Sequence, residues 1–235
     1  MTRARIVLSM IVLLAAAASG WSAQEPDTVN VSMRLVLPAV GTRRTAPSAV
    51  FWLKPLEQTP AAPFLPERHY TLLQKNRTFR PHLLVIPVGS IVQFPNADPF
   101  FHNVFSLFDG KKFDLGLYEA GSTKSVTFSR EGASYIFCNI HPDMSAVILT
   151  LSTALNVEAD RGGVFRLANV PAGDYEMHVW IEGVAQPDLN KMTRRLHLGP
   201  GSGDLGSIEV PAAIVRPATH TNMYGQPYDR DVKPY

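Results

Sequence analysis

Hydrophobic and polar residues alternate along most of this chain in short runs, a pattern typical of half-buried β-strands. Strands are predicted where such a run is bounded by glycine, proline or other turn formers. They cover residues 29–37, 48–53, 70–74, 83–88, 91–94, 101–105, 125–129, 134–138, 146–151, 164–167, 175–180, 194–198 and 207–210. No long segment has the apolar period of a helix, so the pattern predicts an all-β fold, built as a sandwich or a barrel.

Three stretches interrupt this pattern. Residues 55–66 are rich in proline and are predicted to be a loop or linker. Residues 106–122 contain three glycines and no clear period, which predicts a long connection. From residue 211 onward prolines recur and apolar periodicity is lost, so residues 212–235 are predicted to form an extended or disordered tail.

The first residues have the pattern of a secretory signal peptide. Arg3 and Arg5 precede the apolar run 6–18, and small residues follow up to Ala23. We expect cleavage near residue 23, with an uncleaved anchor as the alternative, and no membrane span in the mature chain. The expected location is the periplasm or the cell exterior. Because the two arginines are not adjacent, export of an unfolded chain is expected, and a metal would enter afterwards.

Composition narrows the class of function. The chain has 235 residues, of which 46% are hydrophobic and 18% are charged, so it can build a core. Without residues 1–23 it has 20 basic and 20 acidic residues. This near-neutral balance gives no indication of nucleic-acid binding.

The only cysteine belongs to a compact group of soft donors. Cys138, His141 and Met144 follow one another as C-x2-H-x2-M. A thiolate, an imidazole and a thioether suit copper, and a second histidine would complete a blue-copper set. His102 is the best candidate for that histidine. Zinc is the main rival metal, although the thioether argues against it. The alternative is structural, because a lone cysteine is most often a small buried hydrophobe.

Residues around this group have supporting roles in the same interpretation. Pro142 stiffens the loop because proline fixes its own φ angle. The Asn103 amide is expected to bridge the two ligand segments or to hydrogen-bond the Cys138 sulfur. The remaining histidines are weak metal candidates because they are scattered along the chain. They are His69, His82, His178, His197 and His220.

Residues 68–152 resemble the cupredoxins of the plastocyanin and amicyanin kind. The resemblance is carried by segments 79–81, 88–96, 102–104, 132–138 and 141–144, and the C-x2-H-x2-M spacing is that of amicyanin. It implies a Greek-key sandwich and one type 1 copper per chain. The implied ligands are His102, Cys138, His141 and Met144. The implied electron port is His141, with Pro142, Phe100 and Ile140 around it.

The flanks carry further resemblances. The whole chain resembles exported plastocyanin-like proteins labelled as methylamine utilization proteins, and residues 48–53 and 163–175 resemble a carboxypeptidase-regulatory-like β-sandwich. We therefore predict that residues 28–60 and 155–211 form one small sandwich, with a cupredoxin domain at 66–153 inserted into it. The simpler alternative is two domains in series, with residues 28–60 adding strands to the cupredoxin.

These observations favour a type 1 copper protein that carries single electrons between transient redox partners and is not an enzyme. Copper storage, sensing or delivery by the same residues is the alternative. A copper reductase or oxidase would need a second copper site with further histidines, and the sequence has no second histidine cluster. A structural interpretation gives the flanking sandwich an adhesion or docking role. The sequence leaves the oligomeric state open.

Overall fold

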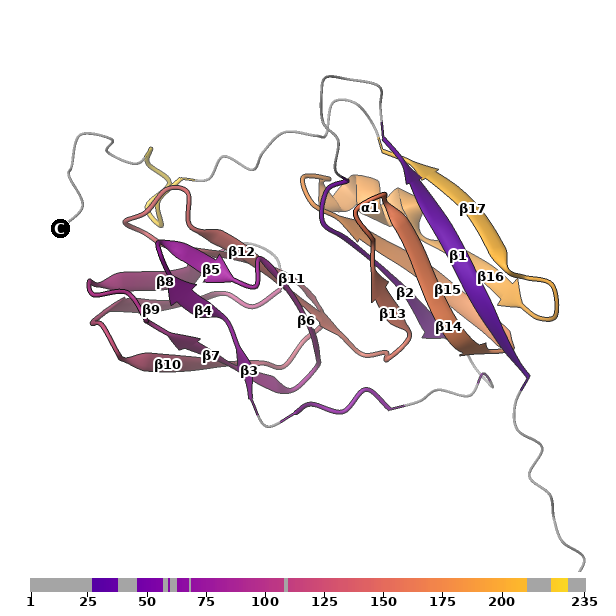
Figure 1. The fold of residues 1–235 in the computed structure, drawn as a ribbon, viewed down its shortest axis with the longest axis horizontal. Coiled ribbons are helices and arrows are strands. Elements are labelled where there is room, and N and C mark those ends of the chain that lie inside the picture. The colour runs from indigo at the N-terminus through magenta and orange to yellow at the C-terminus, as the bar shows by residue number, and fades with distance from the viewer. Residues whose placement is uncertain are drawn as a thin grey trace, which may run out of the picture.

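The computed structural model describes residues 27–37, 46–56, 59, 63–67, 69–107, 110–210 and 221–227. The predicted signal peptide lies outside this part of the chain, as does most of the predicted tail. The described residues form strands and one short helix, so the all-β fold class is confirmed (Figure 1). No helix within these ranges has the length and hydropathy needed to cross a membrane.

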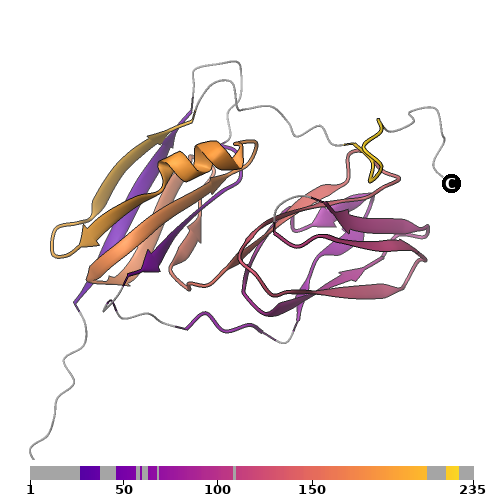
Figure 2. The same ribbon diagram turned by 180° about the vertical axis from the view of Figure 1, so that it is seen from behind.

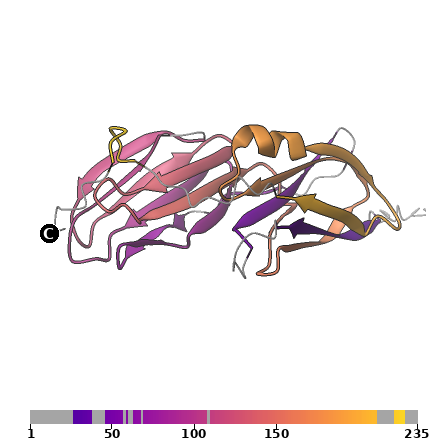
Figure 3. The same cartoon turned by 90° about the horizontal axis from the view of Figure 1, so that it is seen from above.

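The strands form two sandwiches that lie side by side (Figures 1 and 3). The central sandwich contains the strands from β3 to β12, and the flanking sandwich contains β1, β2 and β13 to β17. In the described part of the chain, β1 and β2 pair only with strands that follow residue 155. The chain therefore starts the flanking sandwich, builds the central one and then returns to the first.

The central sandwich packs a five-stranded sheet against a three-stranded sheet. The larger sheet has the order β6 (Leu83–Pro87), β12 (Ser145–Leu151), β11 (Gly132–Phe137), β8 (His102–Ser106) and β9 (Phe113–Tyr118). The smaller has the order β10 (Thr123–Phe128), β7 (Ser90–Pro95) and β3 (Tyr70–Thr71), and β4 (Leu73–Lys75) pairs with β5 (Thr78–Arg80). Neighbours such as β8 and β11 are not consecutive, so the connections cross between sheets as in Greek-key sandwiches.

The flanking sandwich has a three-stranded and a four-stranded sheet. The first has the order β14 (Val164–Pro171), β1 (Thr28–Val36) and β17 (Asp204–Glu209). The second has the order β13 (Asn156–Glu158), β2 (Ala49–Pro55), β15 (Gly173–Ile181) and β16 (Arg194–Leu198). Helix α1 (Gln186–Met192) follows β15 and buries Leu189 (Figure 2).

Strand β12 joins the two sandwiches because both of its faces are buried. Ala146 and Ile148 point into the central sandwich, whereas Val147, Leu149 and Leu151 belong to the apolar cluster of the flanking sandwich. Successive side chains of a strand point to opposite faces, so a strand that is buried on both faces has a continuous apolar sequence. The flanking sandwich therefore covers one outer face of the central sandwich, and any functional site there must open at another surface.

The structure adds two elements that the sequence patterns did not predict. The long connection predicted for 106–122 contains β9, whose pattern is broken by Gly116 at a φ of 65° and by a bulge in β9 opposite Asn103–Phe105. Helix α1 was not predicted, because its seven residues are too few to show a helical period. A smaller departure concerns the tail, where residues 221–227 form a hydrogen-bonded turn.

Candidate metal centre

The predicted ligands come from one strand end and one loop. His102 is the first residue of β8, and Cys138 directly follows the last residue of β11. His141 and Met144 lie in the loop that leads into β12. Because β8 and β11 are neighbours in the sheet, His102 and this loop meet at the same end of the central sandwich.

Two backbone hydrogen bonds close the loop on itself. The N–H of Cys138 donates to the carbonyl of Met144 at 3.2 Å, and the N–H of Met144 donates to the carbonyl of His141 at 3.1 Å. Pro142 lies inside the second of these turns and fixes one backbone angle there. The loop therefore holds its donor residues together through its own backbone.

Three donor atoms converge in the interior. The distance from Cys138 Sγ to His141 Nδ1 is 3.5 Å, and the distance from Cys138 Sγ to His102 Nδ1 is 3.8 Å. One donor atom from each residue lies within 4.8 Å of the others. His102 and Cys138 are fully buried, and His141 is 6% exposed. The cluster is thus sealed except for a small opening at His141.

These separations fit a shared metal ion. Bonds of about 2.0–2.1 Å to a histidine nitrogen and about 2.3 Å to a cysteine sulfur place the two donors about 3.5–3.8 Å apart at tetrahedral to trigonal angles. The two observed sulfur–nitrogen distances fall in that range. Met144 is fully buried in the same apolar cluster as Cys138, so its thioether stays the candidate for a fourth donor. A site with such donors favours copper over harder cations.

Asp98 fixes the orientation of His102 and was missed by the sequence interpretation. Asp98 Oδ2 lies 2.8 Å from His102 Nε2, on the side of the ring opposite to Cys138. A carboxylate at Nε2 favours the tautomer with its proton there, which leaves the Nδ1 lone pair for a metal. In the sequence, Asp98 looked only like one of several turn formers between Pro95 and Pro99.

The turn formers around Asp98 keep its carboxylate charged and in place. Burial raises the pKa of Asp98, but the N–H groups of Arg77 and Asn76 and the contact with His102 outweigh it, so the pKa is lowered. Those N–H groups donate to the carboxylate at 2.9 and 2.6 Å. The side chain of Asn96 accepts from the Asp98 N–H at 3.0 Å. A support of this kind outside the donor set orients a metal ligand.

Asn103 bridges the two ligand segments, one of the two roles proposed for it. Its Oδ1 accepts the N–H of Asn139 at 3.3 Å, and its Nδ2 donates to Asp114 at 2.7 Å. The backbone of Asn103 also hydrogen-bonds the thiol of Cys138. The backbone of Asn103 therefore contacts the Cys138 sulfur, while its side-chain amide connects β8 to the loop after Cys138.

Without a metal, burial favours the neutral forms of the Cys138 thiol and the His141 imidazole. It raises the pKa of the Cys138 thiol, against the opposing effect of hydrogen bonds from the backbone of Asn103, Ile140 and His141. Burial, followed by electrostatic repulsion from His102 and Arg77, lowers the pKa of His141 to about 4. His141 is thus neutral at pH 7 and has a lone pair to donate. Metal binding would have to displace the thiol proton.

An aromatic side chain covers the two histidines. The ring of Phe100 lies 5.3 Å from that of His102 and 5.8 Å from that of His141, centroid to centroid. The guanidinium of Arg77 lies 5.1 Å above the Phe100 ring. The next residues outward, Phe101 and Ile140, are 57% and 42% exposed. The opening at His141 thus has an apolar border with one cation beside it.

The other histidines do not join this cluster where the structure describes them. His82 contacts Glu182, His178 stacks on Trp52 and His197 contacts Asp174. His69 is exposed, and His220 lies outside the described residues. Over the described ranges, His102, Cys138 and His141 are the group of histidine, cysteine and acidic residues that meets the geometry of a metal site.

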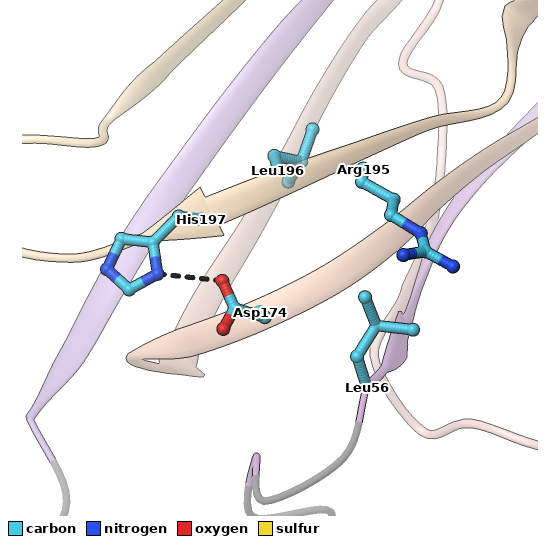
Figure 4. A pocket seen from close by; sticks show the side chains of 5 residues that line it. All are labelled: Leu56, Asp174, Arg195, Leu196 and His197. Atoms are coloured by element: carbon cyan, nitrogen blue, oxygen red, sulfur yellow. Dashed lines mark hydrogen bonds and ion pairs between the residues drawn. The ribbon is translucent and has the colours of Figure 1, made fainter.

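A rival site is an open pocket of about 600 Å³ on the flanking sandwich, lined by Leu56, Asp174, Arg195, Leu196 and His197 (Figure 4). His197 Nδ1 and Asp174 Oδ1 are 2.8 Å apart, but these side chains are 74% and 61% exposed. The described lining includes no serine, threonine or cysteine that this pair would activate. The pair also lacks the burial that changes the acid–base properties of side chains in active sites.

No protein-family profile and no curated protein sequence matches this chain. Among solved structures, a novel purple cupredoxin from Nitrosopumilus maritimus is 24% identical over 36% of this chain and 100% of its own, with a TM-score of 0.32. A reduced amicyanin variant is 20% identical over 43% of this chain and 99% of its own (TM-score 0.33). A copper-containing nitrite reductase from Thermus scotoductus is 26% identical over 42% of this chain but 25% of its own (TM-score 0.34).

The central sandwich is a two-sheet β-sandwich of the Greek-key kind. Its strand order crosses between two sheets, β6 runs parallel to β12, and β3 runs parallel to β7. Three of the four candidate donors, His102, Cys138 and His141, gather at one end of this sandwich. The resemblances of the flanks to methylamine utilization proteins and to a carboxypeptidase-regulatory-like sandwich stay predictions.

Proposed function

We propose that this protein is an exported type 1 copper protein that carries single electrons between transient partners. His102, Cys138 and His141 would supply the three strong ligands, and Met144 the weak one. The observation that carries this proposal is the convergence of two imidazole nitrogens on one buried sulfur, within 4.8 Å. When bound, copper supplies a one-electron couple that no side chain of the cluster has alone.

The chain contributes rigidity to this function. Backbone hydrogen bonds at Cys138 and Met144 close the loop, and Asp98 contacts the nitrogen of His102 that does not face Cys138. A donor set fixed in this way moves little when its charge changes, which lowers the reorganisation needed for electron transfer. The hydrogen bonds from the backbone to Cys138 stabilise the thiolate form of the sulfur.

Electrons would enter and leave through His141. It is the one member of the cluster with any exposure, and exposed Ile140 and Phe101 lie in the two segments that supply the ligands. Redox encounter complexes have small interfaces, and a limited apolar border suits such brief contacts. We expect several different redox proteins to be able to dock there, because apolar contacts of this size discriminate weakly.

Copper storage, sensing or delivery is the alternative, with the same donors. Delivery needs the ion to leave, and therefore needs at least two donors to be reachable by an acceptor. Cys138, His102 and Met144 are all fully buried, which supports retention of the ion over exchange. The enzyme interpretation is not favoured, because the rival Asp174–His197 pair is exposed. A location outside the cytoplasm rests on residues 1–23.

The test is a titration of the purified mature chain with Cu(II), followed by visible absorption and electron paramagnetic resonance. We expect an intense thiolate-to-copper band that saturates at one copper per chain, with narrow hyperfine splitting. Cys138→Ser should abolish the band, and His197→Gln, which alters a histidine of the flanking sandwich, should leave it intact. A colourless product, or a band that survives in Cys138→Ser, would overturn the assignment.

A further inference from the structure

The C-terminal residues 221–227 form an ordered turn rather than a featureless tail. The side chain of Asn222 accepts hydrogen bonds from the N–H groups of Tyr224 and Gln226 at 3.0 and 2.9 Å. Its backbone N–H donates to the carbonyl of Gln226, and its carbonyl accepts from Gly225, both at 2.9 Å. This turn satisfies its own polar groups and can therefore dock as a unit.

The turn docks on the metal loop. The N–H of Met223 donates to Oδ1 of Asn139 at 2.8 Å, across 84 positions of sequence. Figures 1 and 2 show the yellow turn against the end of the central sandwich where β11 leads into β12. Asn222 and Met223 are half-buried, whereas the other five residues of the turn are exposed. The contact is therefore narrow and centred on Asn139.

Asn139 connects the turn to both ligand segments. It follows Cys138 directly in the chain, and its N–H donates to the side chain of Asn103, next to His102. Its side-chain oxygen accepts from the turn, so the backbone of Asn139 faces β8 while its amide faces the C-terminal segment. Exposed Ile140, the next residue, lies beside this contact.

We propose that this face of the metal loop is a docking surface whose occupant is the chain's own segment 221–227. When docked, the segment holds the loop closed over Cys138 and occupies surface beside Ile140. The part of this proposal that concerns access by redox partners rests on the function proposed above. The contact itself, and its effect on access to Cys138, do not depend on copper.

The expected strength of the contact follows from its size. One neutral hydrogen bond shifts an equilibrium by about two- to tenfold. Docking of that strength is reversible, so a partner or a copper donor can displace the segment. Removal of the segment should then raise the population of the open loop by the same factor, because a buried group is reached only through local opening.

The test measures the reaction of Cys138 with a small disulfide reagent in the metal-free protein. The full chain is compared with a chain ending at residue 220, and each is also made with Asn139→Ala. This substitution removes the acceptor for Met223 and leaves the N–H that bonds Asn103. We expect the shortened chain and the full-length Asn139→Ala chain to react about two- to tenfold faster than the full chain.

The double comparison separates docking from a local effect of the substitution. If Asn139 acts through the segment, Asn139→Ala should add nothing to the rate in the chain that ends at residue 220. Equal rates in the full and shortened chains would overturn the proposal, as would an undiminished effect of Asn139→Ala in the shortened chain. Because no copper is present, this test can be interpreted even if the blue-copper assignment is wrong. Equal rates in the full and shortened chains would, in turn, leave the blue-copper assignment unaffected.

Discussion

The two sandwiches follow the same rules of β packing and differ in what they bury. The flanking sandwich has an apolar core around Phe51, Tyr175 and Trp180. In the described part of the chain, every buried polar or charged side chain lies between Gln74 and Thr153. Burial of such groups is costly unless hydrogen bonds or a metal compensate for it. This contrast is largest around His102 and His141, where the candidate metal centre lies.

The same contrast appears in two pairs of aspartate and histidine. Asp98 and His102 are 2.8 Å apart and buried, with the other histidine nitrogen directed at Cys138. Asp174 and His197 are also 2.8 Å apart, but they are exposed in an open pocket (Figure 4). Identical chemistry at identical distance thus has different consequences, because only the buried pair is aligned with a third donor and shielded from water.

Removal of the largest core side chain should have the greatest effect on stability. Trp180 is 1% exposed, and its Nε1 donates to Tyr135 of the central sandwich at 3.3 Å. Trp180→Ala should lower the free energy of unfolding by about 3–5 kcal/mol. Trp180→Phe, which retains most of the volume, should cost clearly less. Urea unfolding followed by circular dichroism measures both.

This substitution also sharpens the comparison between the sandwiches. If the flanking sandwich is a support, the folded Trp180→Ala chain should still develop the full copper band at saturation. Loss of the band in chains that are shown to be folded would mean that the flanking sandwich shapes the donor set, and the division drawn above would fail.

Neutralising the buried carboxylate should weaken metal binding. Asp98→Asn keeps the shape of the side chain but removes the charge that fixes the His102 tautomer. Loss of such a support typically costs about 10- to 100-fold in metal affinity. Asp174→Asn alters the exposed pair of the flanking sandwich and is the matched control, with no expected change. Competition with a copper chelator measures both affinities.

A result in which both variants bind copper equally well would show that Asp98 is not needed for His102 to donate. The backbone carbonyl of Phe100, which accepts from Asn96 at 2.8 Å, would then be the stronger influence on this turn. The comparison between the two pairs would have to be abandoned, because burial alone would not distinguish them.

Sequence patterns pointed to the candidate donors but not to the residues that support them. Cys138, His141 and Met144 stand out because three soft donors within seven residues are rare, and the nearby loop of turn formers pointed to His102. Asp98 was missed because an aspartate in a turn is ordinary. Its role depends on the N–H groups that face it and on the ring behind it, which only the fold brings together.

The same limit applies to the elements of structure. Strand β12 was predicted because its apolar run is continuous, whereas β9 was missed because a left-handed glycine, Gly116, breaks its alternation. The turn at 221–227 was assigned by composition to an extended or disordered tail. Its order depends on Asn222, which bonds its own neighbours, and on Asn139, which lies 84 positions from Met223. Local patterns do not report such long-range contacts.

Two buried methionines allow a finer comparison. Met144 and Met177 are both fully buried, one in each sandwich. Met144→Leu should retain copper and change the reduction potential, because it removes the weak thioether donor and conserves volume. Met177→Leu should leave the potential unchanged. Both substitutions should cost less than about 1.5 kcal/mol of stability. Voltammetry of the copper-loaded variants distinguishes them, and equal potentials would remove Met144 from the donor set.

The smallest predicted effect concerns His82 and Glu182, an ion pair between the two sandwiches. The Nε2 of His82 lies 2.7 Å from Glu182, and its Nδ1 lies 3.2 Å from the carbonyl of Ser145. Both ring nitrogens therefore face acceptors, which favours the doubly protonated ring. The hydrogen bond to Glu182 is the main reason that the pKa of His82 is raised above its usual value of 6.5, against the opposing effect of burial.

The direction of the pH dependence follows from these shifts. The contribution of His82 is complete below pH 6.5 and is lost as the pH rises through its raised pKa. The pKa of Glu182 is lowered from 4.5, chiefly by the hydrogen bond from His82, so its contribution is lost only as the pH falls below that value. The pair should therefore stabilise the protein most between pH 4.5 and 6.5.

His82→Gln should reduce the free energy of unfolding by less than about 1 kcal/mol at pH 5.5, because both side chains are partly exposed. At pH 8.5 the reduction should be smaller still. His197→Gln, in the more exposed pair of the flanking sandwich, is the control and should change stability less at pH 5.5. An equal cost of His82→Gln at the two pH values would show that the neutral ring bonds Glu182 as well as the charged one does. The join between the sandwiches would then rest on its other contacts, which include the apolar face of β12 and the hydrogen bond from Trp180 to Tyr135.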